Sequence, residues 1–195
     1  MANRLQAQMN FLNELEKLKG IYRRNKVLDR SRGESSAEHS WHIAVMAFVL
    51  AEHVDTDEIN LWKVVKMLLL HDIVEVYAGD TWAYDISGNL SQQEREDRAA
   101  AKLFSLLPDD QAVEFEALRK EFDEGATPEA AFAASIDALQ PLSNHLLSGK
   151  KGDDEPAPSR NDVLRRKSHI EKTSRSLWEL AQGLIHDSVQ HGLYE

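Results

Sequence analysis

Cysteine is absent from the 195-residue chain. Disulfide bonds, thiolate nucleophiles and zinc sites built from cysteine are therefore excluded, and any metal must be held by nitrogen and oxygen ligands. Long apolar runs are also missing, because no stretch approaches the roughly 18 residues needed to cross a bilayer. The amphipathic start MANRLQAQMNFLNELEKL carries acids and amides, unlike the apolar centre of a secretory signal. We therefore expect a cytoplasmic protein that does not bind membranes.

Positive charge is scarce, since 23 Lys and Arg stand against 33 Asp and Glu for a net charge of −10. This balance argues against nonspecific binding of nucleic acid. The first 33 residues are an exception, with eight Lys and Arg against three Asp and Glu. Most of that charge lies in YRRNKVLDRSR at 22–32. The patch is either a solvated basic loop or a set of cations aimed at a small anionic ligand such as a phosphate.

Helical periodicity recurs along the chain, and no long stretch alternates as a β-strand would. Capping patterns support several helix starts, at SSAE from Ser35, at SQQE from Ser91, and at Thr127 before Pro128. The polar Gly/Pro segment 149–160 is predicted to be a mobile loop. The sequence thus predicts an all-α protein with one domain over 1–195, with helices at about 4–22, 35–54, 61–78, 91–107, 110–123, from 127 onward, and 160–190.

Three of these predicted helices are strongly apolar, and the second is apolar nearly all round its axis, so we expect it to be buried on most faces. Each of the three contains residues that can bind a metal. His39 lies in the first turn of the second helix, His71 and Asp72 lie toward the end of the third, and Asp137 lies within AAFAASIDALQPL. Alone, each is better explained by a satisfied core histidine or by an aspartate that caps a helix or pairs with a cation. A buried carboxylate is costly unless it is paired or metal-bound. The coincidence favours a mixed nitrogen and oxygen site suited to Mn, Fe, Co, Zn or Mg.

Glu75 follows His71 by one turn and Asp72 by three residues, so a continuous helix would present it on the same face. Apolar surroundings would raise its pKa and allow it to donate a proton. The alternative is a solvated carboxylate at a helix end.

Asp80 follows Gly79, where we expect the chain to leave the helix. It is suited either to accept from a sugar hydroxyl or to cap the next segment. Trp82 and Tyr84 either stack on a base or pack against the protein.

The strings AEHSWHIAVMA, LLHDIVEVYAGDTWAYD and TPEAAFAASIDALQPL, in this order and spacing, resemble the HD-domain metal-dependent phosphohydrolases. Within that family they resemble the 5′-deoxynucleotidase-like group. The resemblance covers roughly residues 10–147 and implies an HD-type helical bundle. It also implies that one divalent metal ion (Mn, Co, Mg, Fe or Zn) is held by His39, His71, Asp72 and Asp137.

The same resemblance implies roles for residues around the metal. Glu75 would be the catalytic acid or base, and Arg23, reached through LKGIYR, would orient the phosphate. Asp80, Thr81 and Trp82 would contact the nucleoside. Some members carry Trp after the arginine, where this chain has Arg24. Arg24 is therefore also a substrate-binding candidate, and the substrate preference that depends on this position stays open.

Family resemblance also implies a homodimer. The first predicted helix carries an apolar stripe that either supplies part of such an interface or closes the core of the single chain. The stripe consists of Leu5, Met9, Leu12 and Leu15.

The predicted activity is release of phosphate from (deoxy)nucleoside 5′-monophosphates. A metal lowers the pKa of bound water and draws charge from the phosphoryl oxygens, while an arginine binds two of those oxygens at once. Hydrolysis of another phosphate ester, such as a cyclic or polyphosphorylated nucleotide, is one alternative. The others are an iron oxygenase on the same scaffold and a noncatalytic helical binding module.

Overall fold

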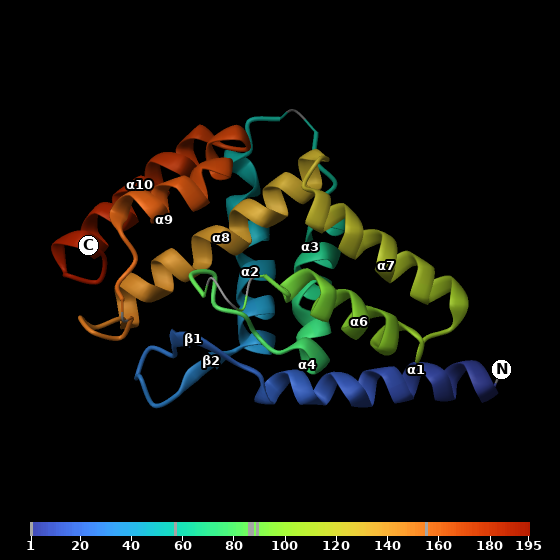
Figure 1. Ribbon diagram of the computed structural model, residues 1–195. Helices are drawn as coiled ribbons and strands as arrows, with labels where there is room; N and C mark the ends of the chain where they lie inside the picture. The colour runs from blue at the N-terminus through green and yellow to red at the C-terminus, as the bar shows by residue number, and fades with distance from the viewer. Residues whose placement is uncertain (1, 57, 86–87, 89, 155) are drawn as a thin grey trace.

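The computed structural model describes residues 2–56, 58–85, 88, 90–154 and 156–195. Figure 1 shows an assembly of helices with one short two-stranded ribbon, and the all-α prediction is confirmed. No helix in these ranges is long and apolar enough to cross a membrane. The elements are α1 (Ala2–Leu15), η1 (Glu16–Gly20), β1 (Tyr22–Lys26), β2 (Gly33–Ser35), α2 (Ser36–Leu50), η2 (Ala51–His53), α3 (Leu61–Leu70), η3 (His71–Val74), α4 (Glu75–Ala78), α6 (Gln92–Phe104), α7 (Asp109–Glu124), α8 (Pro128–Ser148), α9 (Arg160–Lys167), η4 (Ser168–Lys172) and α10 (Arg175–Gln190), with η marking 3-10 helices.

Helices α2, α3 and α8 pack against one another at the centre of the molecule. In Figure 1, α9 and α10 lie to the left of this group, and α6 and α7 lie to its right. The side chains between the central helices are fully buried, including Ile43, Val64, Leu68, Phe132 and Ile136. Burial of each such side chain stabilises the fold by roughly 1.5–3 kcal/mol. The core therefore fixes the helices that carry the predicted metal-binding residues.

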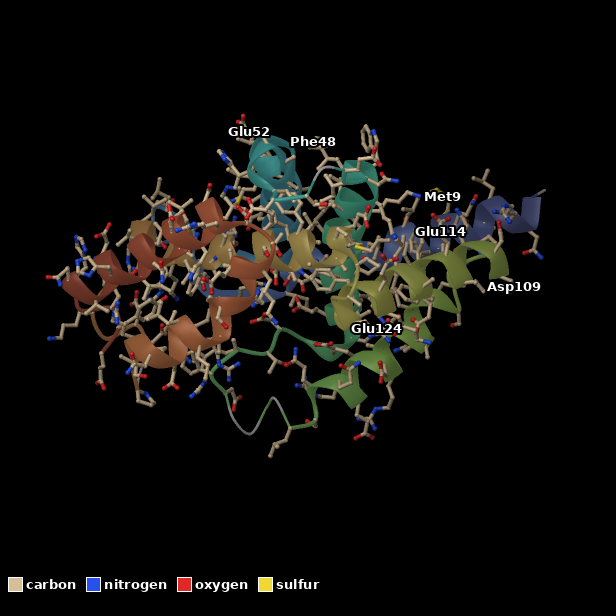
Figure 2. The ribbon with its side chains drawn as sticks, turned by 90° about the horizontal axis from the view of Figure 1, so that it is seen from above. Met9, Phe48, Glu52, Asp109, Glu114 and Glu124 are labelled. Carbon is tan, nitrogen blue, oxygen red and sulfur yellow. The ribbon has the colours of Figure 1, made fainter. Side chains whose placement is uncertain are left out.

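The prediction that the second helix is buried on most faces is wrong. Ile43 and Ala47 of α2 are buried, but Trp41 is 66% exposed and Phe48 is 48% exposed. Figure 2 shows Phe48 on the outer side of α2. The exposed side has no covering element within the described chain because the neighbours of α2 in the core, α3 and α8, pack on its other side.

The apolar stripe of the first helix does not close the core. Leu5, Met9 and Leu12 are exposed, and Met9 stands at the periphery in Figure 2. Among the described side chains of α1, Phe11 is the buried one, and Leu15 packs against the same apolar cluster. The homodimer, for which this stripe is one candidate surface, stays a prediction.

Two of the three predicted helix starts have the expected cap. Ser35 and Glu38 form the reciprocal capping box of α2, and Thr127 accepts from the backbone of Ala130 at the start of α8. Ser91 precedes α6 but makes no side-chain capping bond. Its backbone is not extended, unlike that of Ser35, so the hydroxyl does not reach the first turn.

Four predicted helices are interrupted. The first ends at Leu15 and continues as η1, and the second ends at Leu50 and continues as η2. The third ends at Leu70 and continues as η3 and α4, and the last divides into α9, η4 and α10. The interruption after Leu70 falls at His71 and Asp72, which lie in the first turn of η3. This tighter turn changes the direction in which the two side chains and Glu75 project.

An antiparallel ribbon joins the first helix to the second, where no strand was predicted. Tyr22 pairs with Ser35 and Lys26 pairs with Gly33. A Cβ atom at Gly33 would lie 2.6 Å from the carbonyl oxygen of Arg23, so glycine is required for this close approach. The ribbon therefore holds Arg23 and Arg24 against the end of α8.

The segment predicted as a mobile loop, 149–160, includes Glu155, which lies outside the described residues. The described part folds against the ribbon. Asp153 accepts two hydrogen bonds from Arg30, both of 2.9 Å, and Asp154 accepts one of 2.6 Å from Arg24.

Candidate metal centre and adjoining cavity

His39 is completely buried in the first turn of α2. Its Nδ1 atom lies 3.0 Å from Oε1 of Gln140, while Nε2 of Gln140 donates to Glu34 over 2.8 Å. An amide oxygen only accepts hydrogen bonds, so Nδ1 carries the proton and Nε2 of His39 presents a lone pair.

His71 is fixed in the same way. Its Nδ1 atom lies 2.9 Å from the carbonyl oxygen of Leu68, which only accepts. Its Nε2 atom is buried and has no hydrogen-bond partner within the described residues. In its neutral form the second imidazole therefore also presents a lone pair.

Both lone pairs face carboxylate oxygens. Oδ1 of Asp137 lies 2.8 Å from Nε2 of His39 and 3.6 Å from Nε2 of His71. Oδ1 of Asp72 lies 3.0 Å from Nε2 of His71, and Oδ2 lies 3.9 Å from Nε2 of His39. Such acceptors repel one another unless a proton or a cation lies among them. Ligand atoms of His39, His71 and Asp72 lie within 4.8 Å of one another, and this donor set fits a divalent metal ion.

The electrostatics of the cluster favour added positive charge. Burial lowers the pKa of His71, but the Asp72 and Asp137 carboxylates outweigh it and raise that pKa well above the ordinary value. Burial raises the pKa of Asp137, but the two imidazoles outweigh it and hold that pKa well below its usual range. A proton is attracted here for the same reason that a metal ion would be.

Arg23 reaches the cluster from β1. Its Nη1 atom lies 3.0 Å from Oδ2 of Asp72 and 3.8 Å from Oδ1 of Asp80. Burial lowers the pKa of Arg23, but Asp72, Asp137 and Asp80 raise it above its ordinary value. The guanidinium is therefore permanently charged beside the metal-binding group.

Glu75 is the first residue of α4 and is 7% exposed. Its Oε2 atom accepts a hydrogen bond from the hydroxyl of Ser36. Burial, followed by the negative charges of Asp72 and Asp80, raises the pKa of Glu75 to about 9. The helix does not continue from His71, yet Glu75 faces the same cavity as Asp72. At neutral pH it holds a proton.

A cavity of about 230 Å³ adjoins the cluster. The sequence candidates Arg23, Arg24, Asp72, Glu75, Asp80, Thr81, Trp82 and Asp137 all line it, and His39 and His71 lie behind Asp72 and Asp137 without lining it. The hydroxyl of Thr81 accepts a hydrogen bond of 2.8 Å from Arg95. Cζ of Arg24 lies 4.0 Å from the centre of the Trp82 ring.

Several residues of this region escaped prediction from the sequence. Gln140 and Glu34 orient His39, and Asp154 and Lys167 line the cavity. A polar Gln140 inside the apolar string SIDALQPL was a usable signal, because a buried amide needs partners. Asp154 and Lys167 lie in polar stretches where nothing distinguishes them from solvated residues.

A family model for the HD domain matches residues 15–178. The chain therefore belongs to the HD-domain family of metal-dependent phosphohydrolases. Among relatives, human 5′-deoxynucleotidase HDDC2 is 29% identical over 153 residues, which cover 78% of this chain and 72% of that protein. The corresponding protein of Xenopus laevis is 26% identical over 149 residues, which cover 74% and 72%.

Solved structures agree in fold. A predicted metal-dependent phosphohydrolase from Magnetospirillum magnetotacticum MS-1 superposes with a TM-score of 0.89 at 44% identity, covering 98% of each chain. The PH0347 protein from Pyrococcus horikoshii OT3 has the same fold, with a TM-score of 0.66 at 22% identity over 90% of this chain and 99% of that one.

Proposed function

We propose that this protein releases phosphate from nucleoside 5′-monophosphates, with a preference for the deoxy forms. One observation carries the proposal. Two imidazole lone pairs converge with the carboxylates of Asp72 and Asp137, beside a cavity that also holds a protonated Glu75 and a charged Arg23. The names of the 5′-deoxynucleotidase relatives support the choice of substrate.

In this proposal His39, His71, Asp72 and Asp137 hold one divalent metal ion, drawn from Mn, Co, Mg, Fe and Zn. The bound metal supplies a water of lowered pKa and withdraws charge from the phosphoryl group. Gln140 and Leu68 hold the two imidazoles in the tautomer that binds a metal, which is the usual function of such outer contacts.

Arg23 binds the phosphoryl oxygens with the two-pronged geometry that a guanidinium provides. Attack of water forms a new P–O bond as the bond from phosphorus to the 5′-oxygen breaks. Glu75 gives its proton to the departing 5′-oxygen, so that a neutral alcohol leaves. One proton of the attacking water then restores Glu75, and the other stays on the released phosphate. Asp80, Thr81, Trp82 and Arg24 contact the nucleoside from the same cavity.

The test is phosphate release from ribo- and deoxyribonucleoside 5′-monophosphates by the metal-loaded protein, with cyclic nucleotides and nucleoside triphosphates alongside. We expect release from the monophosphates, faster for the deoxy forms, and a loss of about 100-fold or more in Glu75→Gln. Glu96→Gln is the matched control, because Glu96 is also partly buried but does not line the cavity. If phosphate were released only from cyclic nucleotides or triphosphates, the proposed substrate would be wrong. If Glu75→Gln and Glu96→Gln lost activity equally, Glu75 would have no specific role in the reaction.

A further inference from the structure

Lys167 is the last residue of α9, and its side chain lines the cavity beside the metal-binding group. It arrives from the C-terminal part of the chain, whereas Arg23 and Arg24 arrive from β1. The charged groups that act on its ammonium are Asp137, Arg23 and Arg166. Lys167 therefore lies beside one candidate metal ligand and the candidate phosphate-binding arginine.

The ammonium of Lys167 has no partner in the described chain, since no hydrogen bond and no ion pair within 4.0 Å engages it. The other two cations of the cavity are both paired, Arg23 with Asp72 and Arg24 with Asp154. Burial lowers the pKa of Lys167, and Asp137 offsets part of that effect. Lys167 is half-buried, and its ammonium lines the cavity, so an anionic ligand in the cavity could pair with it.

The charges of the cavity point to an anionic ligand. Glu75 aside, the lining carries four carboxylates, Asp72, Asp80, Asp137 and Asp154, and three cations, Arg23, Arg24 and Lys167. A divalent metal ion would add two positive charges. Lys167 supplies one of the five positive charges that oppose these four carboxylates, so it strengthens the attraction of a phosphate dianion.

We propose that Lys167 is a second phosphate-binding residue, whose ammonium contacts a phosphoryl oxygen of the substrate opposite Arg23. This inference rests on the proposed function for the identity of the substrate. It extends the binding site to α9, which the sequence motifs do not include. The ligand chemistry it requires is a phosphate dianion.

A purely structural role makes a different prediction. If Lys167 served only to neutralise Asp137, its removal would lower stability and leave the affinity for phosphate unchanged. If it binds the phosphoryl group, its removal weakens substrate and inorganic phosphate alike. The Michaelis constant and the inhibition constant of inorganic phosphate separate the two roles.

The experiment compares wild-type protein, Lys167→Gln and Lys167→Arg, all loaded with the same metal. Lys172→Gln is the matched control, since Lys172 is an exposed lysine of the adjoining η4 and forms no ion pair with the residues that the structure describes. Loss of a charge-assisted hydrogen bond predicts that Lys167→Gln raises both constants about tenfold or more. Lys167→Arg should recover most of the affinity, and Lys172→Gln should match wild type. Lys167→Met, which keeps the apolar stem, replaces Lys167→Gln if the latter does not fold.

Unchanged constants in Lys167→Gln, with an active wild-type protein, would overturn this inference and leave the proposed function in place. If wild-type protein releases no phosphate from any nucleotide, the proposed function fails. Binding of inorganic phosphate is then measured directly, through its effect on the melting temperature. A rise in melting temperature with phosphate that disappears in Lys167→Gln would then still support the binding role. A rise of equal size in both proteins would overturn it.

Discussion

The guanidinium of Arg24 lies over the ring of Trp82, with 4.0 Å between Cζ and the ring centre. Asp154 holds it there through a hydrogen bond of 2.6 Å to Nε. All three residues line the cavity. One face of the Trp82 ring is therefore covered, and a base that stacks on this tryptophan must take the other face or displace Arg24.

Asp154→Asn removes the charge that holds Arg24 in place. An ion pair and a cation–π contact of this kind are each worth about 1 kcal/mol or less, so we expect the Michaelis constant for a nucleoside monophosphate to rise about fivefold with little change in kcat. Asp153→Asn is the control, because Asp153 pairs with Arg30 and does not line this cavity. Steady-state kinetics give the Michaelis constant and kcat of both variants. Equal effects of the two substitutions would contradict a role for Arg24 in substrate binding.

Gln140→Leu tests the orientation of His39. The substitution leaves the buried Nδ1–H of His39 without an acceptor and Glu34 without a donor. We expect a loss of about 1–3 kcal/mol in the free energy of unfolding and a loss of roughly 10–100-fold in metal affinity. Urea denaturation and metal titration measure the two effects. Gln182→Leu, at an exposed site on α10, is the control and should change neither stability nor metal affinity. An unaltered metal affinity in Gln140→Leu would mean that the Gln140 amide does not set the tautomer of His39.

The metal-binding group was accessible from the sequence because its members break a strong pattern. His39, His71 and Asp72 are polar residues in apolar helices, and such positions are costly unless used. Gln140 is also a polar residue in an apolar helix, but burying an uncharged amide costs less than burying a carboxylate, so it predicts a functional site less strongly. The ribbon that carries Arg23 was not predictable, because YRRNK has no alternation of apolar and polar residues and its pairing depends on close approach at Gly33.

Glu75 gives metal-free protein a specific dependence on pH. Its pKa is about 9 in the folded protein against an ordinary 4.5, so the folded state keeps a proton that the unfolded chain loses. The resulting stability is complete below about pH 4.5 and is lost as pH rises toward about 9. Relative to Glu75→Gln, wild-type protein should lose up to about 1.4 kcal/mol per pH unit in this window. Chemical denaturation at several pH values, with metal stripped from both proteins, measures the difference, and parallel curves would mean that Glu75 is ionised in the fold.

Metal removal should destabilise the protein. A ligand that binds only the folded state at 100 times its dissociation constant adds about 2.7 kcal/mol, so metal-loaded protein should melt several degrees above stripped protein. Asp72→Asn should lose most of this difference, because it removes one negative charge from the ligand set. Asp187→Asn, on the exposed end of α10 and in the second His-Asp pair of the chain, should keep it. A melting temperature that EDTA does not change, in protein shown to contain metal beforehand, would contradict the buried site.

The C-terminal contribution to the cavity was beyond prediction for a different reason. Asp154 and Lys167 come from polar segments, and their positions depend on how the chain returns to β1 and α8 after residue 148. Such returns are set by long-range packing, which leaves no local signature. The break after Leu70 likewise has no glycine or proline beside it that would mark it in the sequence.

Phosphate release from a deoxyribonucleoside 5′-monophosphate, measured as metal is returned to stripped protein, tests the central claim most directly. Stripped wild-type protein should release none, and activity should rise with added Mn or Co to a plateau at one metal ion per chain, with Asp72→Ala inactive throughout. Full activity in verifiably metal-free protein, or equal activity in Asp72→Ala, would contradict the account.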